Sequence, residues 1–123
     1  MFKKVAFTCY PVADMDRARG FYEETLGLVS STASRTSPWV EYDLPGGGCL
    51  AITTVTPQSP SASAGGTIAF EVEDLDACMA DLKGKGVTFL SDLIHSPVCR
   101  MAVVQDTEGN GILLHQLKPK GEA

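Results

Sequence analysis

Glu41, Glu71 and His115 are the residues whose side chains suit acid–base chemistry in this sequence. A carboxylate can accept a proton, and a histidine changes its charge near neutral pH, so His115 is suited to act as a proton shuttle. The sequence assigns His115 no partner. Because charged groups are rarely buried unpaired, the alternative is that all three lie at the solvated rim or edge of a sheet.

An apolar binding wall is the second kind of chemistry that the residue types allow, and its candidates are Phe7, Trp39 and Leu113. Aromatic rings supply a large contact area and stack on planar or cationic ligands. The same rings can fill a hydrophobic core. The residue types alone therefore leave ligand binding and core packing open for Phe7 and Trp39.

The overall composition is that of one folded, acidic domain. The chain has 123 residues, of which 44% are hydrophobic and 20% are charged, which fits a single globular domain and excludes global disorder. Lys and Arg number 10 against 15 Asp and Glu, giving a net charge of −5. Binding to nucleic acid needs a basic face, so this balance argues against a nucleic-acid partner and favours a cationic or neutral small-molecule ligand.

The cysteines and the N-terminal residues indicate a cytoplasmic protein. Cys9, Cys49, Cys78 and Cys99 form no C-x-x-C pair, so we expect buried free thiols in place of a zinc site or a disulfide framework. The N-terminal MFKKVAFTCY has no long apolar stretch for secretion, and no apolar run approaches the ~20 residues that span a membrane. We therefore predict a first β-strand, no membrane segment and a cytoplasmic location.

The sequence consists of two related halves separated by a Ser-, Pro- and Gly-rich stretch, residues 56–66 (TPQSPSASAGG). Val12, Asp14, Met15 and Asp16 recur 60 positions later as Val72, Asp74, Leu75 and Asp76, and Gly27-Leu28 has its counterpart in Gly86-Val87. We predict a single domain over residues 1–123, with a first module at about 1–55, a connector at 56–66 and a second module at about 67–117.

Each half is predicted to contain a strand, a helix and three further strands. Asp14 and Asp74 are suited to cap the two helices, and Gly27 and Gly86 fit the left-handed position that follows a helix. The predicted strands are Lys4–Val12, Leu28–Thr36, Trp39–Leu44 and Cys49–Val55 in the first half, and Thr67–Val72, Thr88–Leu90, Arg100–Gln105 and Gly111–Leu117 in the second. The fold class is therefore α+β, with the helices on one face of the sheet.

Two stretches carry a resemblance to a known family. VADMDRARGFYEETLGL in the first half, and VEDLDACMADLKGKGV followed by DTEGNGILLHQ in the second, resemble the vicinal oxygen chelate superfamily, which contains glyoxalase I, bleomycin resistance proteins and extradiol dioxygenases. Thr107 replaces the proline of the usual D-P-x-G-N turn. The resemblance implies two βαβββ modules whose curved mixed sheets enclose a cavity, with helices on the outer face. Strand alternation would then turn Thr67, Ala69, Glu71, Gly111, Leu113 and His115 toward the cavity.

The resemblance also implies four metal-ligand positions, in the first and last strands of each half, which family enzymes fill with His, Glu or Gln. The corresponding residues here are Phe7, Ala51, Thr67 and Leu113, and a register shift of one residue brings in Ala6, Ile68, Ile112 or Leu114. None is a normal ligand for Zn, Ni, Fe or Mn, so we predict that the usual metal site is absent. The alternative is a relocated site drawn from Cys9, Glu41, Glu71, His95 and His115, although no spacing among them requires convergence.

Without the metal, the resemblance implies small-molecule binding, as in the bleomycin resistance proteins, which sequester drugs without chemistry and need no cofactor. The predicted ligand-binding residues are Phe7, Trp39, Glu41, Thr67, Glu71, Leu113 and His115. The alternative is a lyase, isomerase or dioxygenase that uses a relocated metal or metal-free acid–base catalysis by Glu41, Glu71 or His115. Glyoxalase I activity is not expected, because that chemistry polarises its substrate on the metal. Family members of this length usually dimerise, so a homodimer is predicted.

Overall fold

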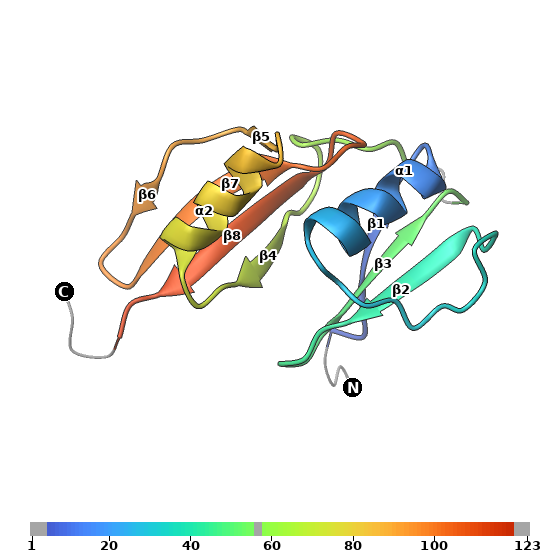
Figure 1. Ribbon diagram of the computed structural model, residues 1–123, viewed down its shortest axis with the longest axis horizontal. Coiled ribbons are helices and arrows are strands. Elements are labelled where there is room, and N and C mark those ends of the chain that lie inside the picture. Colours follow the sequence, from blue (N-terminus) through green and yellow to red (C-terminus); the bar gives the residue numbers. More distant parts are fainter. Residues whose placement is uncertain (1–4, 56–57, 120–123) are drawn as a thin grey trace. The chain divides into compact units, whose positions relative to one another are not determined.

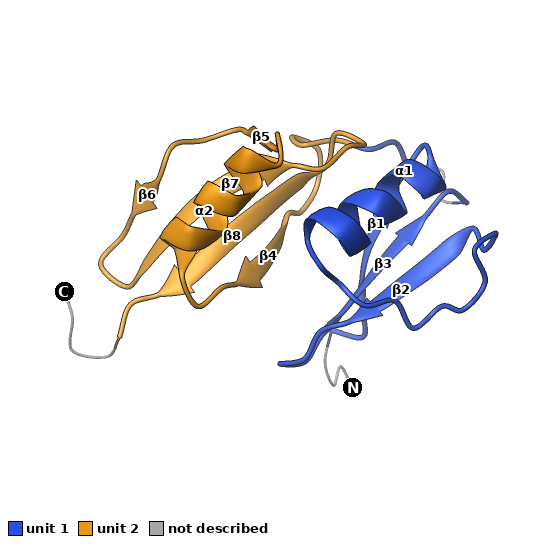
Figure 2. Ribbon diagram, in the orientation of Figure 1, with its two compact units in different colours: residues 1–60 blue, residues 61–123 orange. Residues whose placement is uncertain are grey.

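The computed structural model describes residues 5–55 and 58–119 of the chain. The chain divides into two compact units, unit 1 at residues 1–60 and unit 2 at residues 61–123 (Figure 2). Two predicted segments lie partly outside the described residues. They are the strand Lys4–Val12, at its first residue, and the connector at residues 56–66, at its first two residues.

Unit 1 is a small mixed sheet with one helical segment on one face (Figure 1). Its elements are β1 (Thr8–Pro11), α1 (Met15–Arg19), η1 (Gly20–Thr25), β2 (Trp39–Asp43) and β3 (Cys49–Thr53). The strand order is β1-β3-β2, with β1 parallel and β2 antiparallel to β3. Helix α1 packs on β3.

The predicted strand Leu28–Thr36 is wrong, because only Ser30 of this segment forms a bridge, with Tyr42. The segment is rich in Ser and Thr, whose hydroxyls bond to nearby backbone groups and so compete with sheet pairing. The Ser30 hydroxyl accepts a hydrogen bond from the Thr32 amide at 3.0 Å, and the Ser34 hydroxyl accepts one from the Thr36 amide at 3.3 Å. The first module is therefore β-α-β-β in the described residues.

Unit 2 has a five-stranded sheet and one regular helix. Its elements are β4 (Ile68–Glu71), α2 (Leu75–Gly84), β5 (Thr88–Phe89), β6 (Ile94–His95), β7 (Cys99–Gln105) and β8 (Gly111–Leu117). The strand order is β4-β8-β7-β5, with β4 parallel to β8 and the short, unpredicted β6 paired with β7. Helix α2 packs on β7 and β8. No helix in the described part of the chain is long and apolar enough to cross a membrane.

The predicted helix boundaries are confirmed in both units. The carboxylate of Asp14 accepts a hydrogen bond from the Arg17 amide at 3.0 Å, and that of Asp74 accepts one from the Ala77 amide at 3.0 Å. Each carboxylate thereby satisfies an amide of the first turn that has no partner within the helix. Gly27 has φ of 76° and Gly86 has φ of 79°, a left-handed conformation that favours glycine.

The turn before β8 closes without the proline that is usual at position 107. The Asp106 carboxylate accepts hydrogen bonds from the amides of Glu108 and Asn110, at 2.9 and 2.8 Å. The Asn110 side-chain amide donates to Asp106 at 3.1 Å, and its oxygen accepts from the Ser61 amide at 3.1 Å. These bonds hold the loop in shape, so Thr107 is tolerated there.

The side chains of each sheet alternate between the face covered by that unit's helix and the opposite face, which we call the helix-free face. The helix-covered faces carry the cores, which include Val40, Tyr42, Leu50 and Ile52 in unit 1 and Ala102, Val104, Ile112 and Leu114 in unit 2. The helix-free faces carry the neighbours of these residues along each strand, including Trp39 and Glu41 in unit 1 and Leu113 and His115 in unit 2.

A polar cluster of Arg19, Glu23 and Tyr42 joins the helical segment to β2. The predicted first helix continues from α1 into η1, a turn of π-helix in which the Leu26 amide bonds to the Phe21 carbonyl at 2.9 Å. The buried Arg19 guanidinium donates to the Glu23 carboxylate at 2.6 Å, and the Tyr42 hydroxyl donates to the same oxygen at 2.9 Å. Burial would raise the pKa of Glu23, but the hydrogen bonds from Arg19 and Tyr42 outweigh it and leave that pKa below its ordinary value.

Replacing Glu23 with glutamine should lower the free energy of unfolding by about 2 kcal/mol near neutral pH, because it leaves the buried Arg19 without its charge partner. The folded-state pKa of Glu23 is depressed, so its stabilisation is present above the unfolded pKa and is lost as the pH falls through the folded pKa. The difference in the free energy of unfolding between wild type and Glu23→Gln should therefore become smaller in acid. Urea unfolding followed by Trp39 fluorescence, repeated at several pH values, measures this difference. The exposed neighbour Glu24→Gln is the control, and a gap that is constant with pH would contradict the prediction.

Candidate functional site

The helix-free face of unit 1 holds an aromatic–carboxylate cluster of Phe7, Trp39, Glu41 and Cys49. Trp39 and Glu41 lie two residues apart on β2, so both side chains project to this face. The Trp39 indole N–H donates to the Glu41 carboxylate at 2.7 Å, and the Cys49 thiol approaches the other carboxylate oxygen at 4.0 Å. The carboxylate of Glu41 is therefore held in one orientation against the indole.

The Phe7 ring meets Trp39 edge to face, with ring centroids 5.4 Å apart and an interplanar angle of 90°. This geometry is favourable for an aromatic pair. Phe7 is 46% exposed and Trp39 is half-buried. Core filling is thus the wrong interpretation for Phe7, and its ring leaves apolar surface available to a ligand.

The helix-free face of unit 2 holds a carboxylate–imidazole pair of Glu71 and His115. The two residues lie opposite each other on β4 and β8, with Met101 of β7 next in the same row. Nδ1 of His115 lies 2.5 Å from one Glu71 oxygen, and the Leu117 amide donates to the other oxygen at 2.8 Å. The backbone hydrogen bond from Leu117, and then the bond from His115, lower the pKa of Glu71.

The ionised Glu71 can only accept a hydrogen bond, so the proton between the two groups belongs to Nδ1 of His115. Nε2 is then the nitrogen available to a ligand. Among the described residues, Nε2 has no hydrogen-bond partner. The sequence shows each of these residues but not their pairing, because it depends on the parallel register of β4 with β8 across 44 positions of the chain.

The seven predicted ligand-binding residues fall into two sets, one in each unit. Phe7, Trp39 and Glu41 belong to the cluster of unit 1. In unit 2, Leu113 lies opposite Ala69 and is half-buried, and Thr67 immediately precedes β4 with the strand parity of Glu71. The sequence prediction missed Cys49 as a member of the cluster. The feature that could have indicated it is its position opposite Asp43 in the β2–β3 hairpin.

A family model described as the glyoxalase/bleomycin resistance protein/dioxygenase superfamily matches residues 4–114. The chain belongs to this superfamily. The resemblance seen in the sequence is thereby confirmed. A search of curated proteins gave no match.

Solved structures of superfamily members share the fold. TnmS3, an antibiotic binding protein from Streptomyces sp. CB03234, is 28% identical, with a TM-score of 0.80 and coverage of 95% of this chain and 98% of that chain. A glyoxalase/bleomycin resistance protein from the same strain is 28% identical, with a TM-score of 0.76 and coverage of 92% and 100%. A superfamily member from Sphaerobacter thermophilus DSM 20745 is 24% identical, with a TM-score of 0.78 and coverage of 94% and 98%, and it shows the fold alone. The predicted α+β fold class is confirmed.

The residues at the superfamily's metal-ligand positions do not fit a divalent cation. Phe7 and Leu113 are apolar, Ala51 is fully buried, and Thr67 offers only a hydroxyl. Within residues 5–55 and 58–119, no group of three or more His, Cys, Asp and Glu side chains is placed to hold a metal ion. Of the residues considered for a relocated site, His95 lies opposite Arg100 and so has the opposite strand parity from His115.

The cysteines of this superfamily member are free thiols, as predicted, but their predicted burial is correct only for Cys99. The other three are partly accessible because they lie at the sheet faces and on α2. Burial raises the pKa of the Cys9 thiol, and burial together with the carboxylate of Glu41 raises the pKa of Cys49. A raised pKa keeps a thiol protonated, so neither residue is activated as a nucleophile.

Replacing His115 with phenylalanine should raise the pKa of Glu71, because the variant loses the hydrogen bond from Nδ1. The Glu71 pKa should remain below its ordinary value, because the larger cause, the Leu117 amide, is retained. The ¹³C shift of the Glu71 carboxylate, followed as a function of pH, measures the change. His95→Phe serves as the control, and an equal change in both variants would rule out the pairing as its cause.

Proposed function

We propose that this superfamily member is a metal-free small-molecule-binding protein that sequesters a drug or toxin. The observation that carries the proposal is that Phe7, at the first metal-ligand position, packs against Trp39 beside a fixed Glu41 carboxylate. An aromatic pair next to an oriented carboxylate suits binding of a planar ligand, and the residues at the four metal-ligand positions lack the donors that metal chemistry needs. The 28% identity to an antibiotic binding protein over 95% of the chain supports the same function.

The proposed ligand is cationic or neutral. Glu41 receives hydrogen bonds from uncharged donors alone among the described residues, so its negative charge has no cationic partner there. The net charge of −5 acts in the same direction by disfavouring anions. We also propose a homodimer in the cytoplasm, where free thiols such as these persist. Sedimentation as a monomer at micromolar concentration would contradict the dimer.

A second candidate function rests on the Glu71–His115 pair. A carboxylate that orients an imidazole through Nδ1 leaves Nε2 as a base, an arrangement that suits metal-free proton abstraction. An enzyme of the isomerase or lyase type would use it in this way. Mass spectrometry of the ligand after incubation separates the two functions. A sequestered ligand is recovered unchanged, whereas conversion that is abolished in His115→Phe would support the enzyme.

Titration with bleomycin and a panel of other aromatic cations should quench the fluorescence of Trp39, the only tryptophan of the chain. Glu41→Gln should weaken binding of a cationic ligand about tenfold and leave a neutral planar ligand nearly unaffected, because only the cation loses a charge partner. Glu24→Gln, an exposed site in the same unit, is the matched control. The absence of binding across the panel, or an equal loss in the control, would overturn drug sequestration.

Protein purified without chelators should contain substoichiometric Zn, Ni, Mn and Fe, because the four ligand positions carry no imidazole or carboxylate. Inductively coupled plasma mass spectrometry measures the content. A single metal present at one ion per chain would refute the metal-free proposal.

A further inference from the structure

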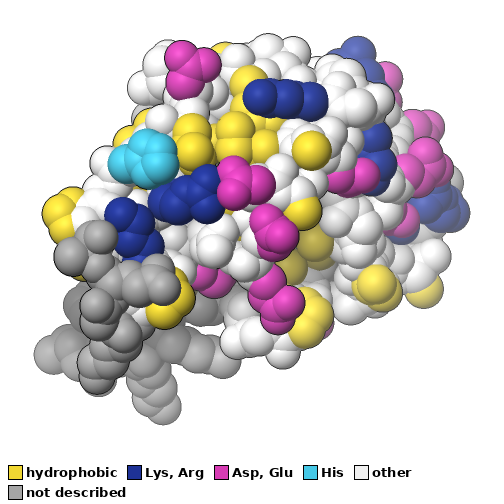
Figure 3. Space-filling view, turned by 60° about the vertical axis from the view of Figure 1, so that its left-hand side comes forward, with side chains coloured by type: hydrophobic (Ala, Val, Ile, Leu, Met, Phe, Trp, Pro, Cys, Tyr) yellow, Lys and Arg dark blue, Asp and Glu magenta, His cyan; other side chains and the backbone are white. Residues whose placement is uncertain are grey.

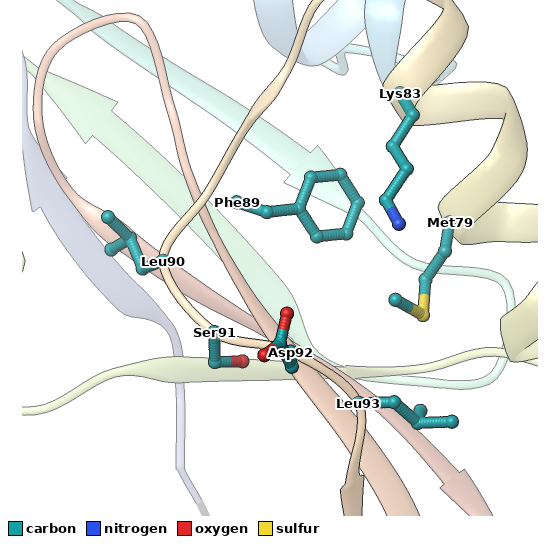
Figure 4. A pocket seen from close by; sticks show the side chains of 7 residues that line it. All are labelled: Met79, Lys83, Phe89, Leu90, Ser91, Asp92 and Leu93. Carbon is teal, nitrogen blue, oxygen red and sulfur yellow. The ribbon is translucent and has the colours of Figure 1, made fainter.

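A cavity of about 410 Å³ lies in unit 2 between α2 and the segment that follows β5 (Figure 4). Its lining residues are Met79 and Lys83 of α2, Phe89, and Leu90, Ser91, Asp92 and Leu93. The cavity lies on the helix side of the sheet, because α2 forms one wall, whereas Glu71 and His115 lie on the opposite face. It shares no residue with either cluster described above.

The cavity is open to solvent, and its lining combines apolar side chains with the polar side chains of Lys83, Ser91 and Asp92. Met79 is nearly buried, and Phe89 and Leu93 are half-buried. The ring of Phe89 points toward Lys83 and Met79 of the helix (Figure 4). Its volume lies within the roughly 300–1,000 Å³ that is usual for ligand pockets.

Two side chains of opposite charge, Lys83 and Asp92, line this cavity. The Lys83 ammonium lies 5.2 Å from the centroid of the Phe89 ring, a cation–π contact. Within the described residues, neither Lys83 nor Asp92 forms an ion pair. On the one face drawn in Figure 3, hydrophobic side chains lie among acidic and basic ones.

The loop wall of the cavity is tied to the sheet. The Leu90 amide donates to the Val103 carbonyl at 2.8 Å, and the Val103 amide donates to the Ser91 hydroxyl at 2.9 Å. These bonds position Asp92, one residue further along, opposite the helix. A ligand therefore meets a preformed wall and loses little free energy to ordering the loop.

We propose that this cavity binds a small zwitterion with an apolar body, of the kind represented by an apolar amino acid. The ligand carboxylate pairs with Lys83, the ligand ammonium pairs with Asp92, and the apolar body packs against Met79 and Phe89. A ligand with only a carboxylate would be repelled by Asp92, and one with only an ammonium would be repelled by Lys83. The two opposite charges therefore select a molecule that carries both.

The test is a ¹H–¹⁵N NMR titration of the full chain with L-phenylalanine, compared with 3-phenylpropionate, which lacks the ammonium, and phenethylamine, which lacks the carboxylate. We expect saturable shifts of the amides of residues 79, 83 and 89–93 by L-phenylalanine, with a dissociation constant on the order of 1 mM. Each singly charged analogue should bind more weakly, by about threefold or more. Equal binding of an analogue, no saturation, or shifts confined to the helix-free faces would overturn the proposal.

Variants that remove one charge test whether Lys83 and Asp92 bind the ligand. Lys83→Gln and Asp92→Asn should each weaken L-phenylalanine binding by about three- to fivefold, the effect of one exposed ion pair. Lys85→Gln removes a lysine from the same end of α2 that is paired with Asp81 and does not line the cavity, so it is the matched control. Unchanged binding in both Lys83→Gln and Asp92→Asn, or an equal loss in the control, would refute the assignment.

Discussion

Strand β2 supplies side chains to two faces of a sheet, and its register against β3 decides which residue goes where. Val40 and Tyr42 lie opposite Ile52 and Leu50 and are fully buried. Trp39 and Glu41 must then project to the other face, because neighbouring strand residues alternate. A slip of one residue would bury the Glu41 carboxylate and expose Val40 and Tyr42. The hydrogen bond from Tyr42 to Glu23 opposes such a slip, so the core and the aromatic–carboxylate cluster depend on the same pairing.

The same alternation between two faces applies in unit 2, where it exposes a carboxylate–imidazole pair in place of an aromatic–carboxylate cluster. Ile112 and Leu114 of β8 are buried on the side of α2, which sends Leu113 and His115 to the helix-free face. The parallel pairing with β4 then brings Glu71 opposite His115. In each unit the helix-covered face packs in the core, and the helix-free face can carry polar groups. Such a division lets one fold support different functions, because changes on the helix-free face leave the core intact.

Local signals in the sequence predict much of this structure. The aspartate caps, the left-handed glycines and the alternation of more and less buried residues in β4 and in the middle of β8 act over a few residues, and all are confirmed. The segment Leu28–Thr36 is different, because its apolar start suggests a strand while its hydroxyls bond to their own backbone. The π-turn of η1 also has no local signature. It accompanies the contacts of Arg19 and Glu23 with partners elsewhere in unit 1.

Candidate site residues were predictable by type and face, but their partners were not. Alternation places Glu71, Leu113 and His115 together on one face, yet the hydrogen bond between Glu71 and His115 requires knowledge of strand order. The cavity beside α2 was not predictable, because it depends on the path of the loop after β5 and on which helix face meets it.

The two units differ in the aromatic residues that spectroscopy can observe. The only tryptophan and all tyrosines, Trp39, Tyr10, Tyr22 and Tyr42, belong to unit 1, where Tyr22 stacks on Tyr42 with ring centroids 5.9 Å apart. Unit 2 carries phenylalanine as its only aromatic ring besides histidine. Indole and phenol absorption, and the emission that follows it, therefore record unit 1 alone. Unit 2 is optically silent in that range, so its folding has to be followed by a method that observes the backbone.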